Sequence, residues 1–530
     1  MQKNFAIMAL QNLPIGIQSF EDLRSNNYLY VDKTEYIYNL VTTGKPYFLS
    51  RPRRFGKSLL ISTFDCLFSG RKELFEGLYM YDKWDWTKTN PVIRFDFGSQ
   101  NYQNAERLEE DLIAKVNEYA AQYEIELSRT WPARFAELIE KIHKKTGEKI
   151  VVLVDEYDKA IIDHLKEMEL ADQIRIALHN FYQILKAVDD HLRFVFLTGV
   201  SKFSRISIFS GLNNLNDLTM SDKYAAVCGY TQEELLSYFD SYIEELAISE
   251  AQTKDEIIKQ IKDNYDGYSW DGKTFVYNPF STLKLFNEKK FIDYWFESGT
   301  PTFLVDLIKQ RNDIQLITKP FPLAADAFNA YDIQNIDTKL LLFQTGYLTV
   351  KSIRKNPFSN SLTYLLDIPN QEVRTGLMTH LLAGFSENSI PDTTTLRDTM
   401  MEQLFNGDTA AFNRNLKAMI AHIPYQLHIP EESYYHSLFI LWLKMLGFKV
   451  DAEVSTNTGR IDAVWTWGDR VVIAEVKYTK EGNLDTLISE AFTQIREKKY
   501  YERYNGENKR IALLAVAFAG REITSQMEEL

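Results

Sequence analysis

Residues 46–60 read PYFLSRPRRFGKSLL, and this stretch decides the fold. The apolar run at 46–49 predicts a short buried strand, and the apolar spacing of 59–64 predicts a helix packed on a sheet. A strand, a loop with Gly-Lys-Ser and a helix, in that order, form the context in which such a loop holds phosphate. The stretch therefore predicts an α/β domain with a parallel sheet and a phosphate loop.

The chemistry of this loop is that of an anion site. Backbone N–H groups of the loop and the first helical turn point at one spot, and the helix dipole adds positive potential there. Lys57 is expected to reach the β- and γ-phosphates of ATP, and Ser58 to hold Mg²⁺ through its hydroxyl. The nucleotide contacts are expected from Arg54, Phe55, Gly56, Lys57, Ser58 and Leu59.

One position departs from the usual pattern, G-x-x-x-x-G-K-[ST]. The residue five positions before Gly56 is Arg51 instead of glycine, so the loop loses one permissive residue. It gains Arg51, Arg53 and Arg54, which we expect to neutralise phosphates or the carboxylates of a later strand. The alternative is a chance Gly-Lys-Ser beside a surface arginine cluster.

Composition sets the outer bounds. The length of 530 residues allows about three to four domains, and a hydrophobic content of 45% is that of a globular protein. A net charge of −13 argues against non-specific coating of nucleic acid, although a local basic channel stays open. Cys66 and Cys228 lie far apart without metal spacing, which fits a reducing cytoplasm. We expect no signal peptide at 1–10 and no membrane partner, because no apolar run approaches about 18 residues.

A second acidic motif follows the phosphate loop. Residues 28–34 alternate like a strand, residues 91–97 predict another, and residues 102–123 and 133–146 predict helices. An apolar strand at 149–155 then ends in Asp155 and Glu156. Asp155 is expected to hold the water shell of Mg²⁺, and Glu156 to polarise the attacking water as the catalytic base. The alternative is an acidic strand end that faces solvent.

A further strand at 192–201 ends in small polar residues. Thr198 or Ser201 could sense the γ-phosphate there. Arg205 could contact phosphate, or could be an ordinary surface arginine.

These motifs resemble the AAA-ATPase-like family of bacterial proteins. The resemblance rests on residues 48–59, 153–158, 197–204 and 209–215, and it covers about residues 8–230. It implies an ATP-binding P-loop fold in which an arginine-rich loop without the first glycine is usual. The middle region, 231–425, predicts a mainly helical lid or coupler with a small winged or hairpin element, and a capping box begins at Thr231.

The last hundred residues change character. A helix at 431–443 precedes a strand near 448–454, a hairpin of 460–467 with 470–478, a helix at 484–502 and a strand at 511–518. Glu475 and Lys477 are two apart on a strand, so both point to one face, and hairpin pairing places Asp462 beside them. Asp462 and Glu475 suit a Mg²⁺ site, and Lys477 suits water orientation or transition-state stabilisation. The alternative is a solvent-facing hairpin with a Glu–Lys pair.

This order of elements resembles the PD-(D/E)XK nuclease superfamily over about residues 425–520. Ile461 stands where the proline of the family name would be. The resemblance implies that Glu432 assists metal binding and that Gln494 joins Glu475, Lys477 and Asp462 in the catalytic set.

The sequence thus predicts a P-loop ATPase domain at 1–230, a mainly helical region at 231–425 and a restriction-endonuclease-like α/β domain at 426–530. The expected cofactors are ATP and Mg²⁺, the expected partner is nucleic acid in the form of DNA, and a homo-oligomer stays open. The expected biology is defence or mobile-element function. Two alternatives remain: a nucleotide-driven switch whose C-terminal domain binds nucleic acid or protein without cutting, and a remodelling ATPase.

Overall fold

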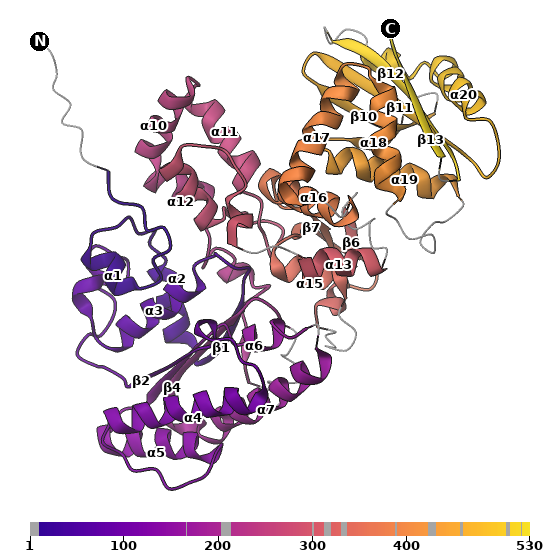
Figure 1. Ribbon diagram of the computed structural model, residues 1–530. Coiled ribbons are helices and arrows are strands. Elements are labelled where there is room, and N and C mark those ends of the chain that lie inside the picture. Colours follow the sequence, from indigo (N-terminus) through magenta and orange to yellow (C-terminus); the bar gives the residue numbers. More distant parts are fainter. Residues whose placement is uncertain are drawn as a thin grey trace, which may run out of the picture. The chain divides into compact units, whose positions relative to one another are not determined.

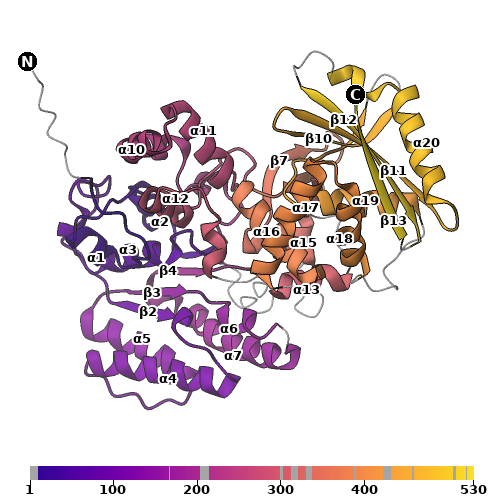
Figure 2. The same cartoon turned by 45° about the horizontal axis from the view of Figure 1, so that its top comes forward.

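The computed structural model describes residues 10–165, 167–202, 214–298, 302–311, 320–329, 337–386, 389–421, 431–455, 459–504, 509–520 and 522–530 (Figures 1 and 2). The chain forms two compact units. The first comprises Met1–Trp295 and Phe321–Glu372, and the second comprises Phe296–Pro320 and Val373–Leu530. The three-part functional division at residues 230 and 425 stays a prediction.

The first unit is built on a parallel five-stranded sheet. Its order is β2 (Val92–Asp96), β3 (Ile150–Asp155), β4 (Leu192–Gly199), β1 (Pro46–Ser50) and β5 (Asn216–Asp217). All six residues of β3 are buried, because helices cover both faces of the sheet. The predicted α/β fold class is confirmed.

Helices lie on both faces of this sheet. Figures 1 and 2 show α1 (Phe20–Ser25) and α3 (Lys57–Phe68) on one face, with α4 (Ala105–Gln122), α5 (Ala133–Thr146) and α7 (Met168–Ala187) on the other. The sequence predicted α3, α4 and α5 to within a few residues. Among the described residues, this part also contains the helices α2 (Thr34–Thr43) and the short α6 (Lys159–Ile162).

The strand expected at residues 28–34 does not form. Leu29 and Val31 are buried against the helices that follow residue 230, in an irregular segment. Asp32 bends the chain there, because its Oδ1 accepts hydrogen bonds from the Thr34 backbone N–H and hydroxyl. The alternation therefore reflects alternate burial without sheet pairing. The helix start at Thr34 is confirmed.

A helical subdomain and a small sheet complete the first unit. The helices are α9 (Gln232–Tyr238), α10 (Asp240–Glu250), α11 (Lys254–Tyr265) and α12 (Pro279–Glu288), and the predicted capping box of Thr231 and Glu234 is present. The antiparallel sheet has the order β6 (Phe321–Ala324), β8 (Leu362–Asp367) and β7 (Thr349–Lys355), and α15 (Thr338–Thr345) lies between β6 and β7 in the chain. The predicted small hairpin element is thus present.

The second unit contains a mixed five-stranded sheet. Its order is β13 (Glu522–Glu529), β12 (Arg510–Ala519), β11 (Arg470–Thr479), β10 (Arg460–Trp467) and β9 (Asp451–Ser455). The predicted hairpin is confirmed as the antiparallel pair β10–β11, and β12 lies parallel to β11. The sequence did not predict β13, an acidic edge strand whose polar composition hides its pairing.

Helices cover both faces of this second sheet. The helix α20 (Leu484–Glu497) packs on the face that carries Ile473 and Leu513. The helix α19 (Glu432–Met445) covers the other face, where Tyr435 stacks on Tyr478 with ring centres 4.4 Å apart. Where the structure describes the second unit, it also contains the helices α13 (Thr302–Arg311), α16 (Gln371–Ser386), α17 (Ile390–Phe405) and α18 (Thr409–Ala421). Of the helices within the described ranges, none combines the length and apolarity that crossing a membrane needs.

Candidate active sites

The phosphate loop curls around the ammonium group of Lys57. Its Nζ donates to the carbonyl oxygens of Arg51 and Pro52, at 3.0 Å each, and the side chain is buried. Arg54 and Gly56 adopt positive φ angles of 69° and 87°, which turn the backbone into the first residue of α3. The loop therefore has a defined shape that Lys57 helps to hold.

Arg51 stabilises this loop through contacts with the surrounding backbone and with Trp270. The guanidinium donates to the carbonyls of Ser50 and Thr219 at 2.9 Å each and to that of Tyr224 at 3.1 Å. It also lies 3.8 Å from the ring centre of Trp270. Burial lowers the pKa of Arg51 to about 10, which leaves it charged at neutral pH. Nη1 and Nη2 of Arg51 are engaged by backbone carbonyls, whereas its Nε has no partner among the described residues. The expectation that Arg51 neutralises phosphate or a carboxylate of a later strand stays a prediction.

The other predicted nucleotide contacts lie on the same turn. The Phe55 ring is buried edge-on against Tyr268 and Trp270, and Phe55 also lines a cavity beside the phosphate loop. The Arg54 guanidinium lies 3.7 Å from the ring centre of Phe280. Ser58 and Leu59 are half-buried in the first turn of α3.

The acidic strand end lies at the same edge of the sheet as the phosphate loop. Because β3, β4 and β1 are adjacent and parallel, their carboxyl ends meet there. The Thr198 hydroxyl donates to Asp155 Oδ1 at 2.6 Å, so two residues that the sequence proposed separately are in direct contact. Glu156 follows with a φ of 51° and packs against Gly98, and burial raises its pKa.

Asp158 holds the backbone at the end of β4. Its carboxylate accepts hydrogen bonds from the backbone N–H groups of Val200 and Ser201 and from the Ser201 hydroxyl. This arrangement holds the chain at the end of β4 and engages the Ser201 hydroxyl. Both hydroxyls proposed to sense phosphate thus donate to a carboxylate, Ser201 to Asp158 and Thr198 to Asp155. Arg205 lies outside the described residues.

A largely apolar cavity lies beside the phosphate loop. Gly56 and Leu59 form one wall, and residues from three distant segments form the others, among them Leu29, Val31, Tyr230 and Pro279. Sequence reasoning missed this cavity, because its lining is assembled only by the fold. The one sequence signal was the alternation at 28–31, which marks the buried side of that segment.

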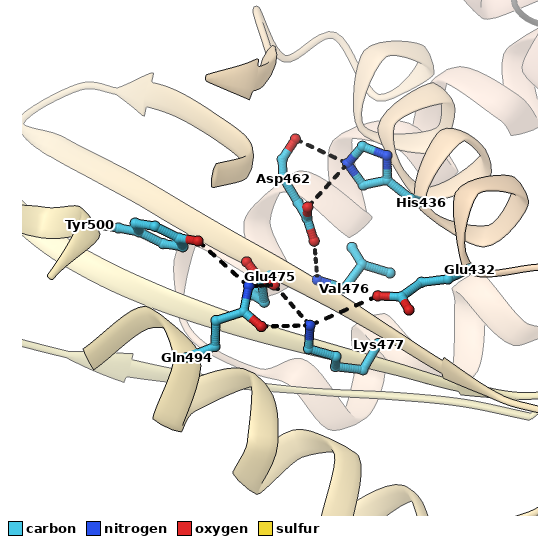
Figure 3. A network of polar contacts seen from close by, with 8 residues as sticks. All are labelled: Glu432, His436, Asp462, Glu475, Val476, Lys477, Gln494 and Tyr500. Atoms are coloured by element: carbon cyan, nitrogen blue, oxygen red, sulfur yellow. Dashed lines mark hydrogen bonds and ion pairs between the residues drawn. The ribbon is translucent and has the colours of Figure 1, made fainter. Parts of the chain in front are cut away.

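The C-terminal motif forms a compact polar network (Figure 3). Lys477 Nζ donates to Glu475 Oε1 at 3.0 Å and to Gln494 Oε1 at 2.8 Å. The amide of Gln494 in turn donates to Glu475 Oε1. Glu432, from the start of α19, lies 3.8 Å from Lys477 Nζ. The structure thus brings together Glu475, Lys477, Gln494 and Glu432.

Asp462 lies next to this network on β10. Its Oδ2 accepts a hydrogen bond of 2.8 Å from the backbone N–H of Val476, between the two motif residues of β11. His436 Nε2 lies 3.1 Å from the Asp462 carbonyl oxygen and 3.7 Å from Oδ1. Tyr500 reaches Gln494 with its hydroxyl at 3.5 Å. Sequence reasoning missed His436 and Tyr500, since neither lies in the core motif.

The site disfavours the charged form of Glu475, even though the Lys477 ammonium lies 3.0 Å from its Oε1. The side chain is 1% exposed, and burial, followed by the charge of Asp462, raises its pKa to about 7. Its Oε2 has no hydrogen-bond partner within the described part of the chain. Burial alone would lower the pKa of Lys477, but the carboxylates of Glu475 and Glu432 raise it. The network therefore carries excess negative charge around one open carboxylate oxygen.

These residues fit a small divalent cation with few protein ligands. Across the described ranges, no three His, Cys, Asp or Glu side chains are grouped closely enough to hold a metal ion. Mg²⁺, however, usually takes one or two carboxylates and completes its shell with water and substrate phosphate. Asp462 and the open oxygen of Glu475 supply that pair, whereas Glu432 faces Lys477.

Known protein families match both of the regions that contain the candidate sites. The family model described as "Predicted AAA-ATPase" matches residues 14–209, and that of the "PD-(D/E)XK nuclease superfamily" matches residues 430–528. A protein of Azotobacter chroococcum mcd 1, described as "Uncharacterized protein in vnfD 5'region", is 38% identical over 524 residues, which are 97% of each chain. Both resemblances expected from the sequence are confirmed. The chain belongs to the AAA-ATPase-like family, and its C-terminal domain belongs to the PD-(D/E)XK nuclease superfamily.

Proposed function

We propose that this protein binds and hydrolyses ATP in its first unit and cleaves nucleic acid phosphodiesters with a Mg²⁺-dependent site in its second. The observation that carries the nuclease proposal is the buried Glu475 Oε2, which has no partner within the described part of the chain and lies in a site with Asp462 and Lys477. A buried carboxylate with an open oxygen beside a second carboxylate is costly, and a proton or a divalent cation relieves that cost.

In the ATPase site, each residue has a task that its position allows. Lys57 exchanges its two loop carbonyls for the β- and γ-phosphates, and the N–H groups of α3 complete the anion site. Ser58 and Asp155 hold Mg²⁺, while Thr198 keeps Asp155 oriented. Glu156 accepts a proton from the attacking water, which its raised pKa favours. The apolar cavity beside Gly56 receives the nucleobase.

In the nuclease site, Asp462 and Glu475 hold the metal. When bound, Mg²⁺ supplies a Lewis acid for the phosphate and lowers the pKa of a coordinated water. Lys477 orients the attacking water or stabilises the charge that develops on phosphate. Gln494 fixes the positions of both Lys477 and Glu475, and Glu432 lies close enough to assist.

The biological setting extends this proposal. We propose DNA as the nucleic acid, and a role in defence or mobile-element biology, in which nucleotide hydrolysis controls cleavage. Cys66 and Cys228 are both buried free thiols, which supports a reducing compartment such as the cytoplasm.

The test is a cleavage assay on the purified full-length protein. Plasmid and single-stranded DNA are incubated with Mg²⁺, Mn²⁺ or a chelator, each with and without ATP. We expect cleavage that requires the divalent ion and that Glu475→Ala abolishes. ATP hydrolysis without cleavage under every condition would contradict the nuclease half of the proposal.

A second candidate is a nucleotide-driven switch whose C-terminal domain binds without cutting. It is favoured by the contacts of Lys477, whose ammonium is already engaged by Glu475 and Gln494, and by the grouping of only two carboxylates. This candidate predicts nucleic acid binding that is independent of metal and is never followed by cleavage.

A further inference from the structure

The hairpin between β7 and β8 presents an aromatic ring to solvent. Phe358 lies at the tip of this hairpin and is 96% exposed, the highest exposure among the large hydrophobic side chains of the described residues. The tip has a defined backbone, because Asn356 Oδ1 accepts hydrogen bonds from the N–H groups of Phe358 and Ser359 at 2.8 and 3.2 Å. The Asn356 N–H also donates to the carbonyl of Ser361 across the turn, at 2.9 Å. The exposure of Phe358 is therefore built into the turn.

Positively charged side chains lie close to this ring in the sequence. Arg354 and Lys355 end β7 directly before the tip, are exposed, and form no ion pair with any described residue. A further cation, Lys273, belongs to a loop packed against β7, since a Cβ on Gly272 would lie 3.2 Å from both Ile353 Cγ1 and Ser352 Cα. Its ammonium pairs with Asp222 at 3.3 Å, so its charge, unlike those of Arg354 and Lys355, is already paired. In a chain of net charge −13, two exposed cations at the end of β7, next to the turn that carries an exposed aromatic ring, form a local basic surface.

The helix before the hairpin is closed to a ligand. Residues 340–344 of α15 are all buried, and the Gln344 side chain accepts a hydrogen bond from the backbone N–H of Lys202. Of this helix and the hairpin that follows it, the hairpin is thus the part that a partner can reach. Most neighbours of Phe358 at the tip are polar, namely Asn356, Ser359, Asn360 and Ser361. A protein interface would instead surround an anchoring ring with apolar side chains.

We infer that the β7–β8 hairpin binds single-stranded nucleic acid, with Phe358 stacked on an unpaired base and Arg354 and Lys355 on the adjacent phosphates. An aromatic platform beside cations is the combination that proteins use to hold such strands. The inference rests on the proposed function, because it takes nucleic acid as the substrate of this protein. It adds a site in the first unit, made of residues outside both candidate active sites.

Binding of a fluorescein-labelled single-stranded DNA to the full-length protein tests this inference. Fluorescence anisotropy is measured in a Glu475→Ala background, so that cleavage cannot interfere. Phe358→Ala should weaken binding about tenfold and leave the salt dependence unchanged, since stacking carries no charge. Arg354→Ala with Lys355→Ala should also flatten the slope of log affinity against log salt by about 1.4, at about 0.7 per phosphate contact.

Matched variants control for general surface effects. Ile248→Ala removes another highly exposed apolar side chain of the same unit, and Lys144→Ala with Lys149→Ala removes two exposed lysines elsewhere. Both controls should bind like the parent protein. Parent-like binding by the hairpin variants would overturn the inference even if the protein cleaves DNA, and so would an effect confined to duplex DNA. A hairpin-dependent affinity in a protein that never cleaves would support the inference and refute the nuclease proposal.

Discussion

The two candidate sites differ in how their charges are balanced. In the phosphate-loop site, Lys57 donates to two carbonyls, Asp155 accepts from Thr198, and Asp158 accepts from three donors. In the nuclease-like site, Glu475 keeps one buried oxygen without a partner among the described residues, and the charge of Asp462 raises its pKa. The first site is held by hydrogen bonds among its own residues, whereas the second leaves one carboxylate oxygen open for the divalent cation that we propose. The phosphate-loop site can therefore stay without its ligand at a small cost in free energy, whereas the nuclease-like site cannot.

The largest effect is expected at Glu475. Replacing it by alanine removes the proposed metal ligand and a contact of Lys477, so DNA cleavage should fall at least about a thousandfold. ATP hydrolysis should be unchanged, because the two sites lie in separate units. Glu490→Ala, an exposed acid of α20, is the matched control and should cleave normally. Normal cleavage by the Glu475 variant would contradict the proposal that the open oxygen of Glu475 binds the metal, which is the difference between the two sites.

Lys57→Ala should raise the dissociation constant for ATP about a hundredfold or more, since charge-assisted hydrogen bonds to phosphate are lost. Calorimetric titration measures this constant, and circular dichroism checks the fold. Arg53→Ala removes an exposed arginine of the same loop and should have a much smaller effect. Equal losses in both variants would show that loop charge alone matters.

Glu156→Gln should bind ATP but hydrolyse it about a hundredfold more slowly, because a general base typically contributes that much or more. Asp158→Asn instead disturbs a carboxylate that holds the end of β4, so it should lower the thermal stability of the protein. Unchanged turnover in Glu156→Gln would exclude it as the base.

Arg51→Gly restores the usual residue of the motif and should nevertheless destabilise the protein, by about 3 kcal/mol. Three backbone carbonyls and the face of Trp270 would lose their cation. Urea unfolding measures the change, with Arg53→Gly as the exposed control. A stabilised Arg51→Gly variant would contradict the supporting role assigned to Arg51.

Glu372 sharpens the comparison, because it is a second buried glutamate with an open oxygen. Its Oε1 accepts from the Trp295 N–H at 2.9 Å, its Oε2 has no partner among the described residues, and burial raises its pKa to about 8. A raised carboxyl pKa means that the folded state holds the proton more tightly. Stability should therefore fall as pH rises from about 5 to about 8, by about 1 kcal/mol per pH unit.

Glu372→Gln should flatten this pH profile, measured by urea unfolding between pH 5 and pH 9. Mg²⁺ should leave the contribution of Glu372 unchanged. If Mg²⁺ removed that contribution, the open buried oxygen of Glu372 would suffice for metal binding. The second carboxylate near Glu475, that of Asp462, would then not be needed to explain metal binding there.

The sequence predicted elements whose signal is local. The phosphate loop, the buried strand before Asp155 and the hairpin of β10 and β11 each combine a hydrophobic period with turn residues at one place. It failed where burial and pairing depend on distant segments, as at residues 28–34 and in β13. In the site, periodicity placed Glu475 and Lys477 on one face, but the contacts of Tyr500 and His436 arise only from tertiary packing.

The replaced glycine has a consequence for how such proteins are recognised. The residues of this loop with left-handed backbone are Arg54 and Gly56, and Arg51 is not among them. A motif search that requires glycine at position 51 thus selects for a positive φ angle that this position does not adopt. A search rule written in terms of conformation, with a cation allowed at that position and an aromatic residue required near 270 to receive it, would retrieve chains that the letter pattern discards.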